Sequence, residues 1–416
     1  MTRAIYASIL TVGAWLMAPL AAHAAQAQAE LPDGPGKPLV QAICTTCHQV
    51  NMIQNSSGYT REHWQELISY MADLKGRPEL ATITEYLAKN FPPNDKRKSV
   101  QVAGTTKIAI KSWTVPTLGQ RARDPVETPD GMIWYNGQFG NLIGRINPKT
   151  NEIKEWVLPP QSLPHSITPD AAGNIWYTGN GNGTVGHLDP KTGDITVFKM
   201  PDPAAVDPHT AIFDKNGTLY FTLQQANMLG RLVPSTGEIK LVKMPRPRSL
   251  PYGIKQSKDG ALWVSCNGSN CIAKVDPVTM EIKIFNLPQA RTTVRRLALD
   301  SNDTVWFVNS GLGYVGRLDP KTGVVKEWPS PSGRASHPYA IEVVNDVIWY
   351  NESGVRPDML VRFDPKTEKF QSWPIASGHV YAGIGRHFRK TQDGNNLLIH
   401  QSGTNHIMLV SIDPKD

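Results

Sequence analysis

Beyond residue 100 the chain alternates short apolar runs with polar turn segments, and this pattern repeats. A segment of the form G-R-[IL]-[DN]-P-K-T-G-x-[IV]-K-x-[WF] recurs, from GRINPKTNEIKEW at Gly144 to VRFDPKTEKFQSW at Val361. Its Asp/Asn-type position falls, at intervals of 42 to 49 residues, on Asn147, Asp189, Val233, Asp276, Asp319, Asp364 and Asp413. A period of this length with turn signals throughout predicts β-propeller blades of four strands each.

The seventh copy of the repeat stops at Asp413, where its outer strand should begin. The missing strand is found before the first copy, because KIAIKSWTVP at residues 107–116 matches NEIKEWVLPP and Trp113 precedes Trp156 by 43 residues. An N-terminal strand that completes the last blade would close the ring and protect its edges. The predicted fold class is therefore mainly β, a seven-bladed β-propeller over residues 107–416 with a small all-α domain before it.

The region before the repeats, residues 30–93, has helical periodicity. A helix is predicted over about residues 60–74, with Thr60 as N-cap and an i, i+3, i+4, i+7 apolar face made of Trp64, Leu67, Ile68 and Met71. Another is predicted over about residues 79–90, ending at two prolines that cannot continue it. An apolar stripe at Leu39, Val40 and Ile43 predicts a further helix just before residue 44.

The first residues read as an export signal. Arg3 is followed by an apolar stretch over residues 5–20, and Ala22-His23-Ala24 fits the small-x-small rule for cleavage. The apolar run is too short for a membrane anchor, and no later stretch is apolar enough to span a bilayer. We therefore expect residues 1–24 to be a signal peptide and the mature protein to reside in the periplasm, without a membrane span.

Composition and charge add few constraints. The 34 glycines and 33 prolines suit an all-β protein with many turns, and the net charge of +7 is modest. The short run Lys96-Arg97-Lys98 is interpreted as part of a solvated linker over residues 94–106, and no nucleic-acid partner is expected.

The four cysteines fall into two pairs. Cys44-Thr45-Thr46-Cys47-His48 has the C-x-x-C-H spacing of a c-type haem attachment site. Two thiols at this spacing can form thioethers with both vinyl groups of one haem, and His48 is then placed to bind the iron as proximal ligand. A thioredoxin-like redox pair or half a zinc site are the alternatives, but the sequence shows neither a βαβ setting nor a second Cys/His pair nearby. One covalent haem c is the predicted cofactor.

Residues 30–93 resemble short monohaem cytochrome c domains of the pattern CxxCH … W-x-x-x-[IV]-x-x-M … YLA-x-x-F. In this chain the matching positions after the haem motif are Trp64, Ile68, Met71, Tyr86-Leu87-Ala88 and Phe91. The resemblance implies that Met71 is the distal iron ligand. The alternative is that Met71 only fills the apolar core. Met52 is a competing candidate for the distal ligand, but it lies very close to His48 in sequence.

The repeat array resembles the virginiamycin B lyase (streptogramin lyase) family of seven-bladed propellers. The unit LPHSITPDAAGNIWYTGNGNGTVGHLDPKTG carries the family's P-H-x-I, W-[FY]-T and [IV]-G-x-[IL]-D-P elements. The resemblance implies lyase chemistry in which a channel histidine acts as base and Mg²⁺ is held by glutamates.

Residues at the start of each inner strand are expected to line the central channel. Counting back from the aromatic residue of each second strand gives a ring of His165, His209, Tyr252, Arg295, Tyr339, Tyr381 and either Arg123 or Asp124. His337 and His379 lie two residues before the tyrosines of their units. Such a ring can bind a ligand or a metal, or it can simply fill the channel with hydrated side chains.

The lyase pattern is incomplete in these blades. The glutamate expected after the W-F-T segment is present only as Glu352, and its unit has Tyr339 in place of the ring histidine. His165 and His209 have Gly179 and Leu223 where the acid should be. These four, His165, His209, Tyr339 and Glu352, are the candidate catalytic residues, and the electron-transfer role is favoured over a lyase.

Three functions therefore remain open at this point. The first is one-electron transfer by the haem, with a propeller that binds a small-molecule substrate or a periplasmic redox partner. The second is a Mg²⁺-dependent carbon–oxygen lyase with an accessory haem, and the third is a non-enzymatic binding scaffold.

The second cysteine pair, Cys266 and Cys271, brackets a hairpin tip and is expected to form a disulfide in an oxidising compartment.

Overall fold

The structure is a computed structural model that describes residues 30–46, 49–93, 97–375 and 385–413. The predicted signal peptide, two of the haem-motif residues (Cys47 and His48) and two channel candidates (His379 and Tyr381) lie outside the described residues. Within those residues, no helix is both long and apolar enough to cross a membrane.

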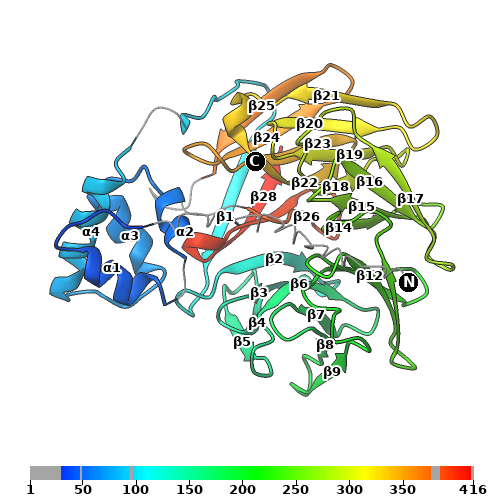
Figure 1. Cartoon of the computed structure of the whole chain (residues 1–416), viewed down its shortest axis with the longest axis horizontal. Coiled ribbons are helices and arrows are strands. Elements are labelled where there is room, and N and C mark those ends of the chain that lie inside the picture. Colours follow the sequence, from blue (N-terminus) through cyan, green and yellow to red (C-terminus); the bar gives the residue numbers. More distant parts are fainter. Residues whose placement is uncertain (1–29, 47–48, 94–96, 376–384, 414–416) are drawn as a thin grey trace, which may run out of the picture.

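A small helical region stands beside a large ring of β-sheets (Figure 1). Its helices are α1 (Lys37–Cys44), α2 (Val50–Asn55), α3 (Arg61–Ser69) and α4 (Pro78–Asn90). The predicted N-cap is confirmed, because the Thr60 side chain accepts a hydrogen bond from the His63 backbone N–H at 3.3 Å. One apolar core joins the helices, and at its centre Val40 of α1 and Ile83 of α4 are fully buried.

The helix predicted over residues 60–74 is shorter in the structure, and this expectation was wrong at its C-terminal end. The helix α3 stops at Ser69, so Met71 lies in the turn that follows rather than on the helix. The physical reason is a contact from the propeller. The Tyr70 carbonyl accepts hydrogen bonds at 2.9 Å from the Gly119 backbone N–H and from Asn405 Nδ2, which draws the chain out of helical geometry.

The described strands form seven four-stranded antiparallel sheets, which are the blades of the propeller. The strands of blades 1 to 3 are β2 (Ala122–Glu127), β3 (Ile133–Gly137), β4 (Leu142–Ile146), β5 (Ile153–Val157), β6 (Pro164–Pro169), β7 (Ile175–Gly179), β8 (Thr184–Leu188), β9 (Ile195–Lys199), β10 (Pro208–Phe213), β11 (Leu219–Leu223), β12 (Met228–Val233) and β13 (Glu238–Lys243). In each blade the first strand contacts the first strand of the neighbouring blade, so these strands surround the axis.

Blades 4 to 6 follow the same order. Their strands are β14 (Pro251–Gln256), β15 (Leu262–Cys266), β16 (Cys271–Val275), β17 (Ile282–Asn286), β18 (Val294–Leu299), β19 (Val305–Asn309), β20 (Tyr314–Leu318), β21 (Val325–Pro329), β22 (Pro338–Val344), β23 (Val347–Glu352), β24 (Met359–Asp364) and β25 (Lys369–Pro374). Cys266 and Cys271 are joined as a disulfide across the β15–β16 turn, with their Cα atoms 5.3 Å apart.

The seventh blade joins both ends of the repeat array, as predicted. It consists of β26 (Arg389–Lys390), β27 (Leu397–Gln401), β28 (His406–Ile412) and the N-terminal strand β1 (Ile108–Thr114), which is the outer strand. In Figure 1, β1 in cyan lies beside β28 in red. Their antiparallel register runs from Ile108 opposite Ile412 to Thr114 opposite His406, so the ring is closed by hydrogen bonds.

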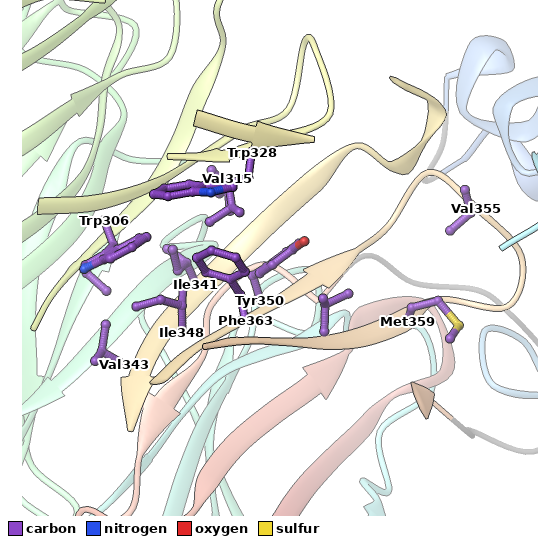
Figure 2. Close-up of a cluster of buried hydrophobic side chains, with 13 residues drawn as sticks. Trp306, Val315, Trp328, Ile341, Val343, Ile348, Tyr350, Val355, Met359 and Phe363 are labelled. Carbon is purple, nitrogen blue, oxygen red and sulfur yellow. The ribbon is translucent and has the colours of Figure 1, made fainter. Parts of the chain in front are cut away.

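Apolar side chains fill the space between neighbouring blades. Figure 2 shows this for blades 5 and 6, where Trp306 and Trp328 of one sheet face Phe363 and Tyr350 of the next. The two tryptophan rings stack with centroids 5.7 Å apart. The aromatic residue of the second strand in blades 1 to 6 thus packs between neighbouring blades, which explains its recurrence in the repeat.

The described part of the predicted linker is bound to blade 6. Lys98 forms a parallel β-bridge with Arg356, and the Val102 N–H donates to Ser372 Oγ at 2.9 Å. Further along, Gln371 Nε2 donates to the Thr106 carbonyl at 2.8 Å. The linker therefore follows the edge of the ring from the helical region to β1.

Candidate functional site

A repeated backbone irregularity places the ring residues in the channel. The first strands of blades 2 to 6 each contain a β-bulge, an extra residue relative to the second strand. The first bulged residues are His165, His209, Tyr252, Arg295 and Tyr339. In blade 1, Val126 pairs with Trp134, the aromatic residue of the second strand, and Arg123 lies three residues before Val126. Bulges re-aim side chains, and here they turn one side chain per blade toward the axis.

Hydroxyl groups link the bulges of blades 2 to 4 to the next blade. In blade 2, Thr178 Oγ1 accepts from the Ser166 N–H at 3.0 Å and donates to the His209 carbonyl at 3.0 Å. In blade 3, Thr222 Oγ1 accepts from the Thr210 N–H at 3.2 Å and donates to the Tyr252 carbonyl at 2.9 Å. These fully buried threonines are the T of the W-[FY]-T pattern.

Ser265 continues the series toward blade 5, where its hydroxyl donates to the Arg295 carbonyl at 2.8 Å. Blade 5 has Val308 at the equivalent position, so this link to blade 6 is missing there. The recurring hydroxyl therefore fixes the backbone of the neighbouring blade's ring residue, which gives the repeat motif a positioning role.

A pocket of about 290 Å³ opens at the end of the channel where the inner strands begin. Six members of the predicted ring line it together: Arg123, His165, His209, Tyr252, Arg295 and Tyr339. The sequence reasoning missed Arg121 and Arg386, which also line it. Arg121 lies just before β2, and Arg386 lies outside the repeat pattern; neither position carried a signal. The lining is therefore rich in guanidinium groups.

The rings in the pocket are packed closely. The His165 and His209 rings have centroids 3.5 Å apart, and His209 lies 4.0 Å from the Tyr252 ring. Burial, followed by the charge of the nearby arginines, lowers the pKa of both histidines well below its ordinary value. Both imidazoles are therefore neutral near pH 7.

Two tyrosines face each other across the pocket, with their hydroxyl groups hydrogen-bonded. Arg295 lies over the Tyr339 ring at 4.9 Å and Arg386 at 5.7 Å. Burial alone would raise the pKa of Tyr339, but the charges of Arg295 and Arg386 outweigh it and lower the pKa to about 7. Burial raises the pKa of Tyr252 to about 12, so Tyr339 is the more acidic phenol of the pair.

Polar groups beneath the pocket hold Arg386 in place. His400 Nε2 accepts hydrogen bonds from the Arg386 and His387 backbone N–H groups at 3.0 and 3.2 Å. Burial lowers the pKa of His400 to about 3, which keeps this nitrogen available as an acceptor. Arg296 Nε donates to the Arg386 carbonyl at 2.9 Å, and Asp124 accepts from His387 Nδ1 at 3.0 Å.

The structure separates Glu352 from the other catalytic candidates. This fully buried carboxylate accepts hydrogen bonds from Ser330 Oγ at 2.6 Å and from the Ser332 N–H at 2.9 Å, and it does not line the pocket. His337 also lies outside the lining and contacts Ser353. Within the described residues, no three His, Cys, Asp or Glu side chains gather as a metal site.

The described part of the haem motif lies in the helical region. Cys44 ends α1 and is partly buried, and both Cys44 and Met71 pack against the same apolar core. Met52 of α2 is more exposed, at 38%. The buried Trp64 Nε1 has no acceptor among the described residues, a feature that a haem propionate could satisfy. Cys44, Met71 and the Trp64 donor thus belong to one small core.

A second hollow of about 640 Å³ lies beside this core, between α3 and the Leu74–Gly76 turn, with Leu118 of the propeller at its edge. Neither Cys44 nor Met71 lines it. The Met71 backbone instead lies against the propeller, because a Cβ on Gly119 would come within 3.0 Å of the Met71 carbonyl oxygen. The segment with the candidate distal ligand is thus fixed by the β1–β2 connection.

The fold and the channel pocket define a seven-bladed β-propeller protein with a ligand-sized cavity on its axis. Residues 108–356 match the model of the virginiamycin B lyase family, and the chain belongs to this family. No curated protein sequence matches the chain.

Solved structures share the propeller fold. The selenomethionine-substituted virginiamycin B lyase from Staphylococcus aureus matches with a TM-score of 0.66 and 22% identity, over 73% of this chain and 99% of that chain. A catalytically inactive variant of that enzyme with quinupristin matches with a TM-score of 0.65 and 22% identity, over the same shares of the two chains. Hydrazine synthase from Kuenenia stuttgartiensis matches with a TM-score of 0.58 and 13% identity, over 70% of this chain and 95% of that chain. At these identities the likeness concerns the fold.

Proposed function

We propose that the chain is a c-type haem protein that transfers single electrons in the periplasm, and that its propeller binds a substrate or a redox partner. The observation that carries the proposal is the C-x-x-C-H motif, whose first cysteine, Cys44, ends α1 beside the core that Met71 also contacts. A haem c held there would supply a reversible ferric/ferrous couple.

The chain's own residues have distinct parts in this proposal. Cys44 and Cys47 would tether the porphyrin, His48 would bind the iron, and the Met71 thioether would complete the coordination and raise the reduction potential. The Trp64 N–H supports the same site, because a buried donor without an acceptor is satisfied by an anionic group placed next to it. The expected export over residues 1–24 supplies the compartment in which such haems persist.

A redox titration tests the haem proposal. The purified full-length protein should show a reduced α-band that appears and disappears reversibly with applied potential, as a one-electron wave. Met71→Ala should lower the midpoint potential, whereas Met52→Ala, the matched control, should leave it unchanged. A wild-type protein without any redox-dependent α-band would contradict the proposal.

Lyase chemistry is the second candidate, favoured by membership of the virginiamycin B lyase family. The neutral imidazoles of His165 and His209 could accept a proton in the pocket. The four lining arginines oppose Mg²⁺ binding, and Glu352 is bonded to serines elsewhere. We therefore expect no opening of quinupristin by the protein with Mg²⁺. A linear isomer of quinupristin, of unchanged mass and separated from it by chromatography, that no longer forms with His209→Ala would establish the lyase instead.

A further inference from the structure

We propose that the channel pocket binds a small organic molecule through an oxyanion group, a carboxylate or a phosphate, held by Arg123, Arg295 and Arg386. The inference rests on the part of the proposed function that assigns ligand binding to the propeller, and it is independent of the haem. It specifies the chemical class of ligand that the channel accepts.

The charges of the pocket are strongly unbalanced. Four guanidinium groups line it, those of Arg121, Arg123, Arg295 and Arg386. Among the described lining residues the carboxylate is Asp207, which is already bound by Asn180 Nδ2 and by the Gln225 N–H at 3.0 Å. Residues 376–384, which lie outside the described part, contain neither Asp nor Glu. The described lining therefore carries an excess of positive charge, although Arg123 also pairs with the buried Asp124 carboxylate at 3.6 Å.

Three of these arginines have unused donors. Arg123 Nη2, Arg295 Nε and Arg386 Nε are buried and have no hydrogen-bond acceptor among the described residues. The Arg123 side chain is only 1% exposed, and its Nη1 is held by Gln138 Oε1 at 2.7 Å, so the orientation of its guanidinium is fixed. Buried unpaired donors are costly, and the planar fork of a guanidinium matches a carboxylate or phosphate.

The same pocket geometry disfavours the binding of a cation. A divalent cation would have to enter between positively charged groups, with neutral imidazoles as its candidate ligands. A volume of about 290 Å³ instead suits a small molecule, and the aromatic faces of His165, His209 and Tyr252 offer a wall for its planar or apolar part. The geometry thus selects a small anion over a metal.

Tyr339 links binding to protonation. Without a ligand, the charges of Arg295 and Arg386 favour the Tyr339 phenolate and lower its pKa to about 7. A bound anion would offset those charges and raise the pKa of Tyr339. Binding near pH 7 should therefore take up a proton at this residue.

Calorimetric titration of the full-length protein tests the site directly. The probes are succinate and inorganic phosphate, which distinguish a carboxylate from a phosphate ligand, with neutral succinamide as control. At least one anion should bind at millimolar concentration or below, and Arg295→Gln and Arg386→Gln should each weaken binding by about tenfold or more. Arg317→Gln, the same charge change on the exposed face of β20 in blade 5, should leave binding unchanged.

The outcomes separate this inference from the haem proposal. Absence of binding for both anions, equal binding of succinamide, or equal weakening by Arg317→Gln would overturn the anion site, whatever the α-band shows. Titrations in buffers with different ionisation enthalpies add a second readout. On anion binding at pH 7 they should show proton uptake in the wild type and little uptake in Tyr339→Phe. A circular dichroism spectrum checks that this variant is folded. Equal proton uptake in both proteins would assign the protonation to another group and contradict the role of Tyr339.

Discussion

Among its described residues, 30–46 and 49–93, the helical region packs twelve buried apolar side chains in one core, whereas every propeller blade packs against two neighbours in a closed ring. A helical unit of this size buries a smaller share of its surface than a large domain does, and many natural units of this size are reinforced by a covalent or metal constraint. The propeller gains its stability from repeated inter-blade packing, and its closing strand removes the exposed edges. The proposed haem is therefore expected to contribute more to the stability of the helical region than to that of the ring.

The two regions meet at a small number of specific contacts. The Tyr70 carbonyl is held by Gly119 and Asn405, and the Tyr70 ring packs edge-on against His406 at 5.3 Å. On the other side, Arg356 lies over the Tyr59 ring at 4.6 Å. The propeller thereby supports the segment that carries Met71.

The largest difference between the regions should appear when haem attachment is removed. In the double variant Cys44→Ala with Cys47→Ala we expect complete loss of covalent haem and of the low-temperature unfolding transition of the helical region. The propeller transition in differential scanning calorimetry should remain. Cys266→Ala with Cys271→Ala removes the other pair and should keep the haem; haem loss in this control would contradict the assignment of the two pairs.

Opening the ring should give the next largest effect. Trp113 of β1 is 5% exposed and its Nε1 donates to Asn151 at 2.8 Å. Trp113→Ala should lower the free energy of unfolding of the propeller by about 3–5 kcal/mol, measured by urea denaturation. Val157→Ala at the exposed end of β5 should change it by less than about 0.5 kcal/mol. Similar values for both would contradict closure by β1.

The hydroxyl links between blades should have an intermediate effect. Thr222→Val keeps the side-chain shape but leaves the Thr210 N–H and the Tyr252 carbonyl without this partner. We expect a loss of about 1–3 kcal/mol in the free energy of unfolding and weaker succinate or phosphate binding, because Tyr252 lines the pocket. Thr196→Val on the exposed face of β9 is the control. Unchanged unfolding free energy and unchanged anion binding in Thr222→Val would contradict the positioning role of this threonine.

The smallest effect is expected at the contact between the regions. Asn405 has a left-handed backbone (φ 53°), so Asn405→Gly keeps the conformation while removing the hydrogen bond to Tyr70. Amide hydrogen exchange of residues 70–72 should become faster, by an amount corresponding to about 0.5–1.5 kcal/mol. Asn345→Gly, at an exposed residue with φ 50°, should leave these amides unchanged. No change in Asn405→Gly would mean that the propeller does not fix the Met71 segment.

Much of the propeller could be predicted from the sequence because its information is local and repeated. Turn residues such as those after Asp189 recur in each blade, and the repeat also exposed the strand around Trp113 as the missing seventh member. The positions of the channel ring could be predicted by counting back from the aromatic residue of the second strand. The structure added the bulges of blades 2 to 6, which show why that count reaches the channel. In blade 1 the pocket lining includes Arg123 and not Asp124.

The rest depended on contacts between distant segments. The end of α3 at Ser69 is set by Gly119 and Asn405, which no helical periodicity reveals. Arg386 reaches the pocket through bonds to His400 and Arg296, and Glu352 turns to two serines of the preceding blade connection. Tertiary partners of this kind decide where a polar side chain acts, and they leave no spacing in the sequence.

The most direct test of the central claim is the intact mass of the protein produced in a host that assembles c-type cytochromes, measured after denaturation. The account predicts the mass of the polypeptide plus one haem, with the added mass on the peptide that contains Cys44 and Cys47. A polypeptide mass with no haem on that peptide would contradict it.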